Sequence, residues 1–229
     1  MQKINKFIFV SGPSESGKSS GVNHIVDTFS NIKHLKIKNI YRALYEKSGS
    51  SLPYDDWRKQ EISRDLENHW REYLKLAAVG ADAHDTIIMD TLYSTTDAIV
   101  LHKILGEQLS LLYIDAPFKS RVLREYHRLR TDSPNTDRKA DLTIKLEDIS
   151  TRTQQKDAKK QSEGMFDYPK LILHADGTVS DKGEGKQLVY IVNNDQDEQT
   201  FHQRLDHYVR SIVLHRVNYN CRSQQNVRE

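Results

Sequence analysis

Residues 12–19 read GPSESGKS, with glycine at the first and sixth positions and a lysine and a serine directly after the second glycine. This order matches the phosphate-binding pattern G-x-x-x-x-G-K-[ST] at every fixed position. In that pattern, backbone N–H groups point at phosphate oxygens, the lysine reaches the β- and γ-phosphates, and the hydroxyl ligates Mg²⁺. We therefore expect the phosphates of a nucleoside triphosphate at Lys18 and a metal ion at Ser19. The residues assigned to the nucleotide are Gly12, Pro13, Ser14, Glu15, Ser16, Gly17, Lys18, Ser19 and Ser20.

The segments on either side of this loop have the character that such a turn requires. Residues 4–10 (INKFIFV) form an apolar run rich in β-branched and aromatic side chains, which is typical of a buried parallel strand. After the loop, Val22, Ile25, Val26 and Phe29 recur at helical spacing. The alternative, a glycine-containing turn that binds no ligand, is disfavoured by this order of strand, loop and helix.

A carboxylate follows another predicted strand. Residues 87–90 read IIMD, an apolar run that ends in Asp90 and resembles a loose Walker-B pattern. Asp90 is predicted to hold Mg²⁺ through water, or to orient the acceptor of a phosphoryl group. A strand-terminal aspartate also serves as a cap for the following segment, and this alternative stays open.

The size of the chain is enough for one α/β domain, or for one domain with an inserted lid. The chain has 229 residues, of which 37% are hydrophobic and 29% charged, and its net charge of +2 argues for neither a nucleic-acid nor a membrane partner. The single cysteine, Cys221, cannot form an internal disulfide. The mean hydropathy is −0.72, and we see neither room for a signal peptide before the first strand nor an apolar stretch of membrane-spanning length. We expect a cytoplasmic protein.

Strand and helix patterns alternate along the chain, which predicts an α/β fold with a mostly parallel, five-stranded sheet. The expected strands are Lys6–Val10, Leu35–Lys38, Thr86–Met89, Leu111–Ile114 and Leu188–Val192. One long amphipathic helix is predicted from about residue 55 to 79, between Pro53 and Gly80. A short hairpin is predicted around Asp176-Gly177, and an amphipathic helix over residues 201–213 closes the fold.

A basic helix is predicted to follow Pro117. It carries several arginines, ends near residues 133–135, and leads into a polar segment over residues 140–164 with sparse apolar residues. Arginines on a helix next to a polar excursion suit charge stabilisation in phosphoryl transfer, and closure of such a lid would exclude water. A solvated basic face is the alternative for any single arginine.

Together these segments resemble the nucleoside-monophosphate kinase group of P-loop proteins. The resemblance rests on FVSGPSESGKS, IIMD, RVLREYHRLR and IVNNDQDEQTFHQRL. It implies a three-layer P-loop NTPase fold in a single domain over residues 1–229, with an acceptor-binding region at about 39–80 and a lid at about 130–165. It also implies ATP, Mg²⁺ and a small-molecule phosphoryl acceptor. The residues to which it gives roles are Lys18, Asp90, Arg124, Arg128, Arg130 and Arg152 in catalysis, Asn193 and Asn194 beside the adenine, and Arg42 at the acceptor.

The acceptor side departs from the adenylate kinase pattern. Asp90 is followed by Thr91-Leu92-Tyr93 in place of the usual Gly-Phe-Pro-Arg. The arginine that would grip the acceptor phosphate at this point is therefore missing, which argues against a common nucleoside monophosphate. The resemblance as a whole still implies an ATP-dependent kinase whose favoured acceptor is a nucleoside or deoxynucleoside monophosphate. One alternative is a hydroxyl acceptor on a sugar, an antibiotic, a coenzyme precursor or a nucleic-acid end. A non-catalytic nucleotide-binding switch is the other alternative, and the absence of an Asn-Lys-x-Asp motif disfavours a GTPase of that kind.

Overall fold

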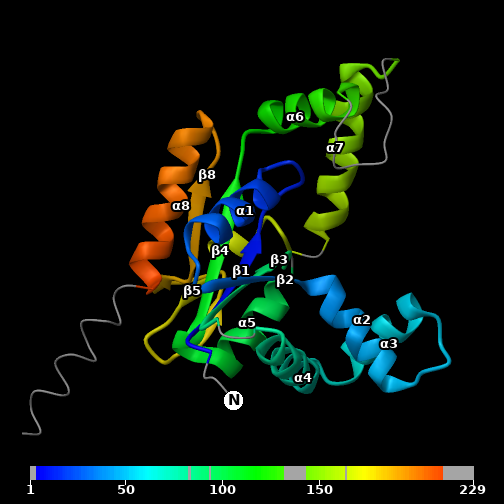
Figure 1. The fold of residues 1–229 in the computed structure, drawn as a ribbon, viewed down its shortest axis with the longest axis vertical. Helices are drawn as coiled ribbons and strands as arrows, with labels where there is room; N and C mark the ends of the chain where they lie inside the picture. The colour runs from blue at the N-terminus through cyan, green and yellow to red at the C-terminus, as the bar shows by residue number, and fades with distance from the viewer. Residues whose placement is uncertain (1–3, 82–83, 93, 132–142, 163, 214–229) are drawn as a thin grey trace, which may run out of the picture.

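The computed structural model describes residues 4–81, 84–92, 94–131, 143–162 and 164–213. Within these ranges the chain alternates strands and helices as the sequence predicts (Figure 1). The strands are β1 Lys6–Ser11, β2 Ile32–Lys36, β3 Thr86–Asp90, β4 Leu109–Asp115, β5 Ile172–Leu173, β6 Val179–Ser180, β7 Lys186–Gln187 and β8 Val189–Asn193. The helices are α1 Lys18–Thr28, α2 Ile37–Ser48, α3 Tyr54–Arg64, α4 Leu66–Val79, α5 Thr95–Leu105, α6 Phe118–Arg130, α7 Leu146–Gln161 and α8 Glu198–Val213, with short 3₁₀ turns at Gly106–Gln108 and Tyr168–Lys170.

The main sheet has five strands in the order β2-β3-β1-β4-β8, and every neighbouring pair is parallel. Val10 and Lys36 both align with Asp90, and Asp115 aligns with Asn193. The carboxyl ends of all five strands therefore meet at one edge, where ligands bind in open parallel sheets. The predicted α/β fold is confirmed.

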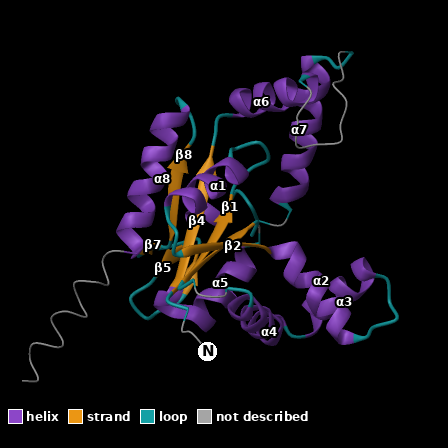
Figure 2. Ribbon diagram, viewed as in Figure 1, coloured by secondary structure: helices purple, strands orange, loops and turns teal. Residues whose placement is uncertain are grey.

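Alternating residues of the strands supply two separate cores, one on each face of the sheet. In β1, Phe7 and Phe9 join the core formed with α2, α4 and α5, whereas Ile8 and Val10 join the core formed with α1 and α8. Figure 2 shows these two layers of helices on opposite faces of the sheet. Burial on both faces explains why the three central strands, β1, β3 and β4, read as nearly continuous apolar runs.

The second strand is shifted from its predicted position. The sequence predicts a strand over Leu35–Lys38, but β2 ends at Lys36 and α2 begins at Ile37. Ile40 and Tyr41 are buried in the core, and Ile37 and Leu44 pack against it, so these apolar residues follow the helical period. As a result, Lys36 and Lys38 lie where the strand turns into the helix.

The prediction of a single long helix over residues 55–79 is wrong, because the helix is interrupted at Asp65. The backbone of Asp65 is extended, with φ −159° and ψ 90°, and its carboxylate accepts a hydrogen bond from the Asn68 N–H at 3.0 Å. Aspartate competes well as an N-cap, so it ends α3 and starts α4 at one residue. The break allows α3 to take its own direction beside α2 (Figure 1).

The predicted hairpin is confirmed as part of a second, small sheet. Strands β5 and β6 pair antiparallel, and Gly177 in the turn has φ +82°. Strand β7 pairs with the other side of β5. The predicted closing helix is α8, while the expected helix break at residues 133–135 and Cys221 lie outside the described residues. No helix in the described part of the chain is long and apolar enough to cross a membrane.

Candidate active site

The loop between β1 and α1 needs its two glycines for conformation and for space. Gly12 and Gly17 have φ values of +138° and +97°, which L side chains rarely adopt. A Cβ atom on Gly12 would lie 2.2 Å from the Ile114 carbonyl oxygen, and one on Gly17 would lie 2.3 Å from Asn194 Nδ2. The two glycines are therefore required by the positive φ angles of the loop and by its close contacts with Ile114 and Asn194.

The loop presents polar groups that suit an anion. The N–H groups of Gly17, Lys18 and Ser19 lie at the N-terminus of α1 and make no backbone hydrogen bond to other described residues. The hydroxyl of Ser16 is buried and, within the described residues, has no hydrogen-bond partner. Because a helix N-terminus favours negative charge, this arrangement fits the phosphates of a nucleotide.

Lys18 lies folded over this loop. Its Nζ atom donates to the carbonyl oxygens of Gly12 at 2.9 Å and Pro13 at 2.5 Å. Burial, followed by the nearby charge of Lys160, lowers the pKa of the Lys18 ammonium to about 7. A lysine held in this way is poorly solvated, so phosphate oxygens would provide both charge compensation and better acceptors.

Asp90 lies at the end of β3, next to β1, and its charge acts on Lys18. His34 Nε2 is 3.0 Å from Asp90 Oδ1. Burial raises the pKa of Asp90, but the hydrogen bond and charge of His34, together with Lys36, outweigh it and lower the pKa below its usual value. Asp90 is therefore ionised at neutral pH.

The few protein ligands at this edge suit a magnesium ion that keeps several of its water ligands. Among the described residues, no group of three or more His, Cys, Asp or Glu side chains could hold a metal ion. Ser19 is exposed in the first turn of α1, and Asp90 ends the neighbouring strand. Mg²⁺ commonly keeps several waters and uses one or two protein ligands with substrate phosphates, so this sparse donor set suits it.

Two adjoining hollows lie beyond Asp90, between the sheet edge and α2 and α3. Each has a volume of about 340 Å³. Arg58 and Tyr41 line both hollows, and the Arg58 guanidinium lies over the Tyr41 ring, 5.3 Å from its centroid. The hollow nearer Asp90 is lined by Lys36, Ile37, Lys38, Tyr41, Arg58, Asp90 and Thr91. Three cations thus surround one carboxylate, which favours an anionic ligand.

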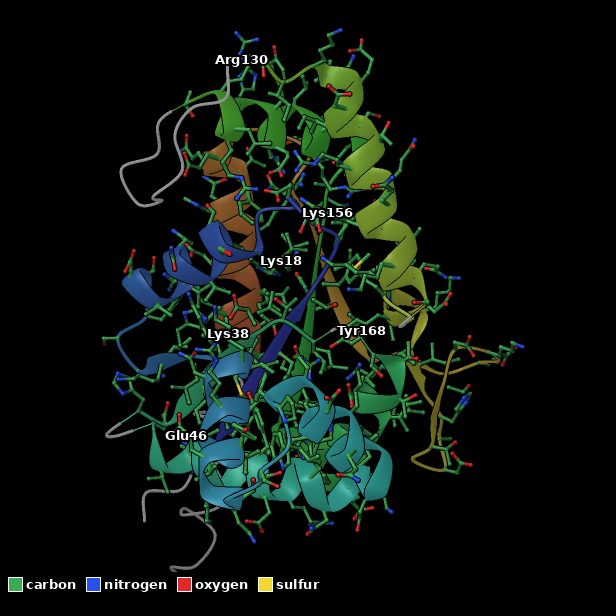
Figure 3. All side chains as sticks on the ribbon, turned by 90° about the vertical axis from the view of Figure 1, so that its right-hand side faces the viewer. Lys18, Lys38, Glu46, Arg130, Lys156 and Tyr168 are labelled. Atoms are coloured by element: carbon green, nitrogen blue, oxygen red, sulfur yellow. The ribbon has the colours of Figure 1, made fainter. Side chains whose placement is uncertain are left out.

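Helices α6 and α7 cover the other side of the phosphate loop, opposite α2 and α3 (Figure 1). Figure 3 shows Lys18 between Lys156 of α7 and Lys38 of α2. The predicted lid segment is therefore helical in its described part and lies against the loop. The loop, the carboxylate and the cationic hollow all meet at the carboxyl edge of the sheet.

Comparison with known proteins does not assign this chain to a family. No protein-family model matches the chain, and no curated protein matches its sequence. Among solved structures, TT1252 from Thermus thermophilus is 12% identical, with a TM-score of 0.48 over 92% of this chain and 99% of that one. A gluconokinase from Sinorhizobium meliloti 1021 is 15% identical, with a TM-score of 0.44 over 93% of this chain and 99% of that one. At this identity and with both TM-scores below 0.5, the functional reasoning rests on the geometry of this chain.

Of the arginines predicted for catalysis, two lie at the phosphate loop. Arg124 donates to the Glu15 carbonyl oxygen at 3.3 Å and to the backbone and side-chain oxygens of Asn194, both at 3.0 Å. Arg128 bonds to the carboxylate of Glu125 and approaches that of Glu15 at 3.4 Å.

The other two predicted arginines are not brought to the loop. Arg130 is exposed at the far end of α6, where it contacts Tyr126 (Figure 3). Arg152 is exposed on α7. Neither makes a hydrogen bond or ion pair with residues 12–19, and their roles in catalysis stay predictions.

Arg58, and not the predicted Arg42, lies at the candidate acceptor hollows. Arg42, predicted at the acceptor, is exposed on α2 and does not line either hollow. Arg58, which the sequence analysis missed, lines both. Asp65, as a candidate N-cap, could have indicated that α3 and α4 are separate helices.

The two asparagines predicted beside the adenine differ in burial and in hydrogen bonding. Asn193 is exposed, whereas Asn194 is buried, donates to the Ser16 carbonyl oxygen at 2.9 Å and accepts from Arg124. Both ends of the Asn194 amide are therefore engaged within the protein, where they join the phosphate loop to the end of β8. Their contact with a base stays a prediction.

We expect Asn194→Ala to destabilise the protein by about 2 kcal/mol, because the buried Ser16 carbonyl loses its side-chain donor and the Arg124 guanidinium loses one of its three acceptors. Asn193→Ala changes an exposed side chain and should cost less than about 0.5 kcal/mol. Urea unfolding of the two variants measures the difference. Equal stabilities would show that the Asn194 amide does not brace the loop.

Proposed function

We propose that this protein is an ATP-dependent phosphotransferase that moves the γ-phosphoryl group to a small anionic acceptor. The observation that carries the proposal is that the phosphate-loop pattern and a hollow lined by three cations meet at one sheet edge, with the Asp90 carboxylate between them. A phosphate loop would be enough for a protein that only binds nucleotides. The second cationic hollow gives a transfer reaction somewhere to place its acceptor.

On the donor side, the loop N–H groups and Lys18 would hold the nucleotide phosphates. Ser19, with Asp90 acting through water, would hold Mg²⁺, which neutralises charge on the phosphate oxygens when it is bound. Phosphoryl transfer asks little covalent chemistry of a protein, so these groups act by position and charge. Their side chains and backbone all belong to elements fixed by the two cores.

In the reaction, the bond between the γ-phosphorus and the bridging oxygen of ATP breaks, and a bond to an acceptor oxygen forms. ADP leaves with the electron pair of the broken bond. A phosphate acceptor attacks with an oxygen that is already deprotonated. A hydroxyl acceptor must lose a proton, which the Asp90 carboxylate can accept.

A nucleoside or deoxynucleoside monophosphate is the acceptor that the hollows favour. Lys36, Lys38 and Arg58 suit its phosphate. The adjoining hollow offers apolar and aromatic walls, with polar side chains that suit the edge of a base. Its lining residues are Ile37, Tyr41, Arg58, Leu66, Trp70, Thr91, Leu92, Ser94, Thr96 and Asp97.

A hydroxyl acceptor is the second candidate, and the pair of Asp90 and His34 favours it. The 3.0 Å contact of the two side chains holds an ionised carboxylate at the acceptor hollow, as a base would require. The cations at the same hollow would then bind another anionic group of that acceptor.

A panel of acceptors tests the proposal, with ADP release from ATP as the measurement. We expect acceptor-dependent ADP release with one or more nucleoside monophosphates. Release only with hydroxyl compounds would transfer the proposal to the second candidate. Tight ATP binding without any acceptor-dependent release would leave a nucleotide-binding switch and contradict the phosphotransferase.

A further inference from the structure

Helix α7 is joined to α6 by an ion pair between Arg121 and Asp157, and Arg121 also contacts the phosphate loop. Arg121 of α6 and Asp157 of α7 form two parallel hydrogen bonds of 3.1 and 2.7 Å, and their side chains are only 5% and 14% exposed. The same guanidinium donates to the carbonyl oxygens of Ala116 at 3.2 Å and Ser14 at 3.3 Å. Arg121 therefore sets the position of α7 relative to the loop, because planar bidentate pairs fix orientation as well as distance.

One turn along the same helix, Lys160 reaches the loop itself. Residues 157 and 160 are three apart and so share a helix face. Lys160 Nζ donates to Ser14 Oγ at 2.9 Å. This places a side chain from α7 on a residue of the phosphate loop that lies two positions after Gly12.

Lys160 and Lys18 bring two ammonium groups into the same small region. After burial, the charge of Lys160 is the largest cause that lowers the pKa of Lys18. Two cations that repel one another beside unbonded N–H groups form a site that an anion stabilises. The hydroxyl of Ser14 is a neutral acceptor, and a phosphate oxygen would be a stronger one.

Two other cations of α6 and α7 near the loop, Arg128 and Lys156, pair with carboxylates. Lys156 is 3.1 Å from Glu125 and 4.0 Å from Glu15, and Arg128 bonds to Glu125 as well. Lys159 is exposed. Lys160 donates to a hydroxyl of the phosphate loop. The exposed Lys159, one residue before it, provides a matched control.

We propose that Lys160 contacts the γ-phosphate of bound ATP, exchanging its hydrogen bond to Ser14 for one to a phosphate oxygen. This inference rests on the proposed binding of ATP at the loop. Lys160 would then distinguish a triphosphate from a diphosphate and stabilise negative charge during transfer. The role differs from that of the predicted lid arginines, because it comes from the last turn of α7.

Binding of ADP and of a non-hydrolysable ATP analogue to wild type, Lys160→Ala and Lys159→Ala tests the inference. A charge-assisted hydrogen bond is worth about tenfold or more in affinity. We expect Lys160→Ala to weaken binding of the analogue by about tenfold or more and binding of ADP by less than about twofold. Lys159→Ala should leave both affinities unchanged. Calorimetric titration measures all of them.

A second variant, Lys160→Gln, keeps a donor for Ser14 but removes the charge, and guards against a loss of loop structure. It should lose the preference for the triphosphate as Lys160→Ala does. Equal losses for ADP and the analogue, or affinities like those of Lys159→Ala, would overturn the inference. The assay needs no acceptor, so a failure of the proposed transfer reaction leaves its result interpretable.

Discussion

Replacement of Lys18 by alanine is expected to reduce turnover with ATP by about 10²-fold or more, because it removes a fixed cation from the site of charge development. The loop itself should persist, since its turn depends on Gly12 and Gly17 and on the contact with Asn194. Steady-state measurement of ADP release gives the effect, and circular dichroism gives the fold. Unchanged turnover in a folded variant would contradict every catalytic role assigned to this loop.

The charge state of Lys18 supplies an independent readout. Its pKa of about 7 in the nucleotide-free protein means that most of the side chain is neutral one unit above that pH. Phosphates favour the charged form and raise the pKa, so nucleotide binding at about pH 8 should take up close to one proton. Affinity should accordingly fall as the pH rises above 7.

Calorimetry in two buffers with different ionisation enthalpies measures this proton uptake. Lys18→Arg is the control, because a guanidinium stays charged in the free protein and has no proton to gain. Uptake that persists in Lys18→Arg would assign the proton to another group. Absence of uptake in the wild type would contradict the lowered pKa of Lys18 in the nucleotide-free protein.

Arg58→Ala is expected to raise the KM for an anionic acceptor by about tenfold or more, through loss of a charge-assisted contact. Arg58 lines both acceptor hollows and lies over the Tyr41 ring, so it is positioned before the ligand arrives. The KM for ATP should change little, because the phosphate loop lies on the other side of Asp90.

Arg42→Ala is the matched control for this prediction, since Arg42 carries the same charge and is exposed on α2. We expect its KM for the acceptor to stay within about twofold of the wild type. A larger effect for Arg42→Ala than for Arg58→Ala would place the acceptor phosphate outside the hollows and support the assignment made from sequence.

The phosphate loop could be predicted in detail because its determinants are local. Two glycines at fixed spacing, a lysine and a serine specify the turn within eight residues, and the apolar run before them specifies the strand. The central strands β1, β3 and β4 could be predicted because burial on both faces leaves continuous apolar runs. Even so, the predicted bounds of β2 are wrong, because residues 35–38 suit a strand end and a helix start equally well.

The rest of the site depends on how helices pack, which local patterns do not contain. The amphipathic pattern continues through Asp65 and predicts one helix. The Asp65 carboxylate instead caps α4 and ends α3. That break gives α3 its own direction, with Arg58 at the acceptor hollow. Likewise, the approach of Lys160 to Ser14 follows from the ion pair of Arg121 and Asp157, two residues 36 positions apart.

Transfer of labelled phosphate from γ-labelled ATP is the most direct test of the central claim. The wild-type protein is incubated with Mg²⁺, the labelled ATP and each acceptor found to stimulate ADP release, and the products are separated. We predict that the label moves to the acceptor and that Lys18→Ala prevents the transfer. Label that remains in ATP, or appears only as inorganic phosphate whichever acceptor is present, would contradict the assignment as a phosphotransferase.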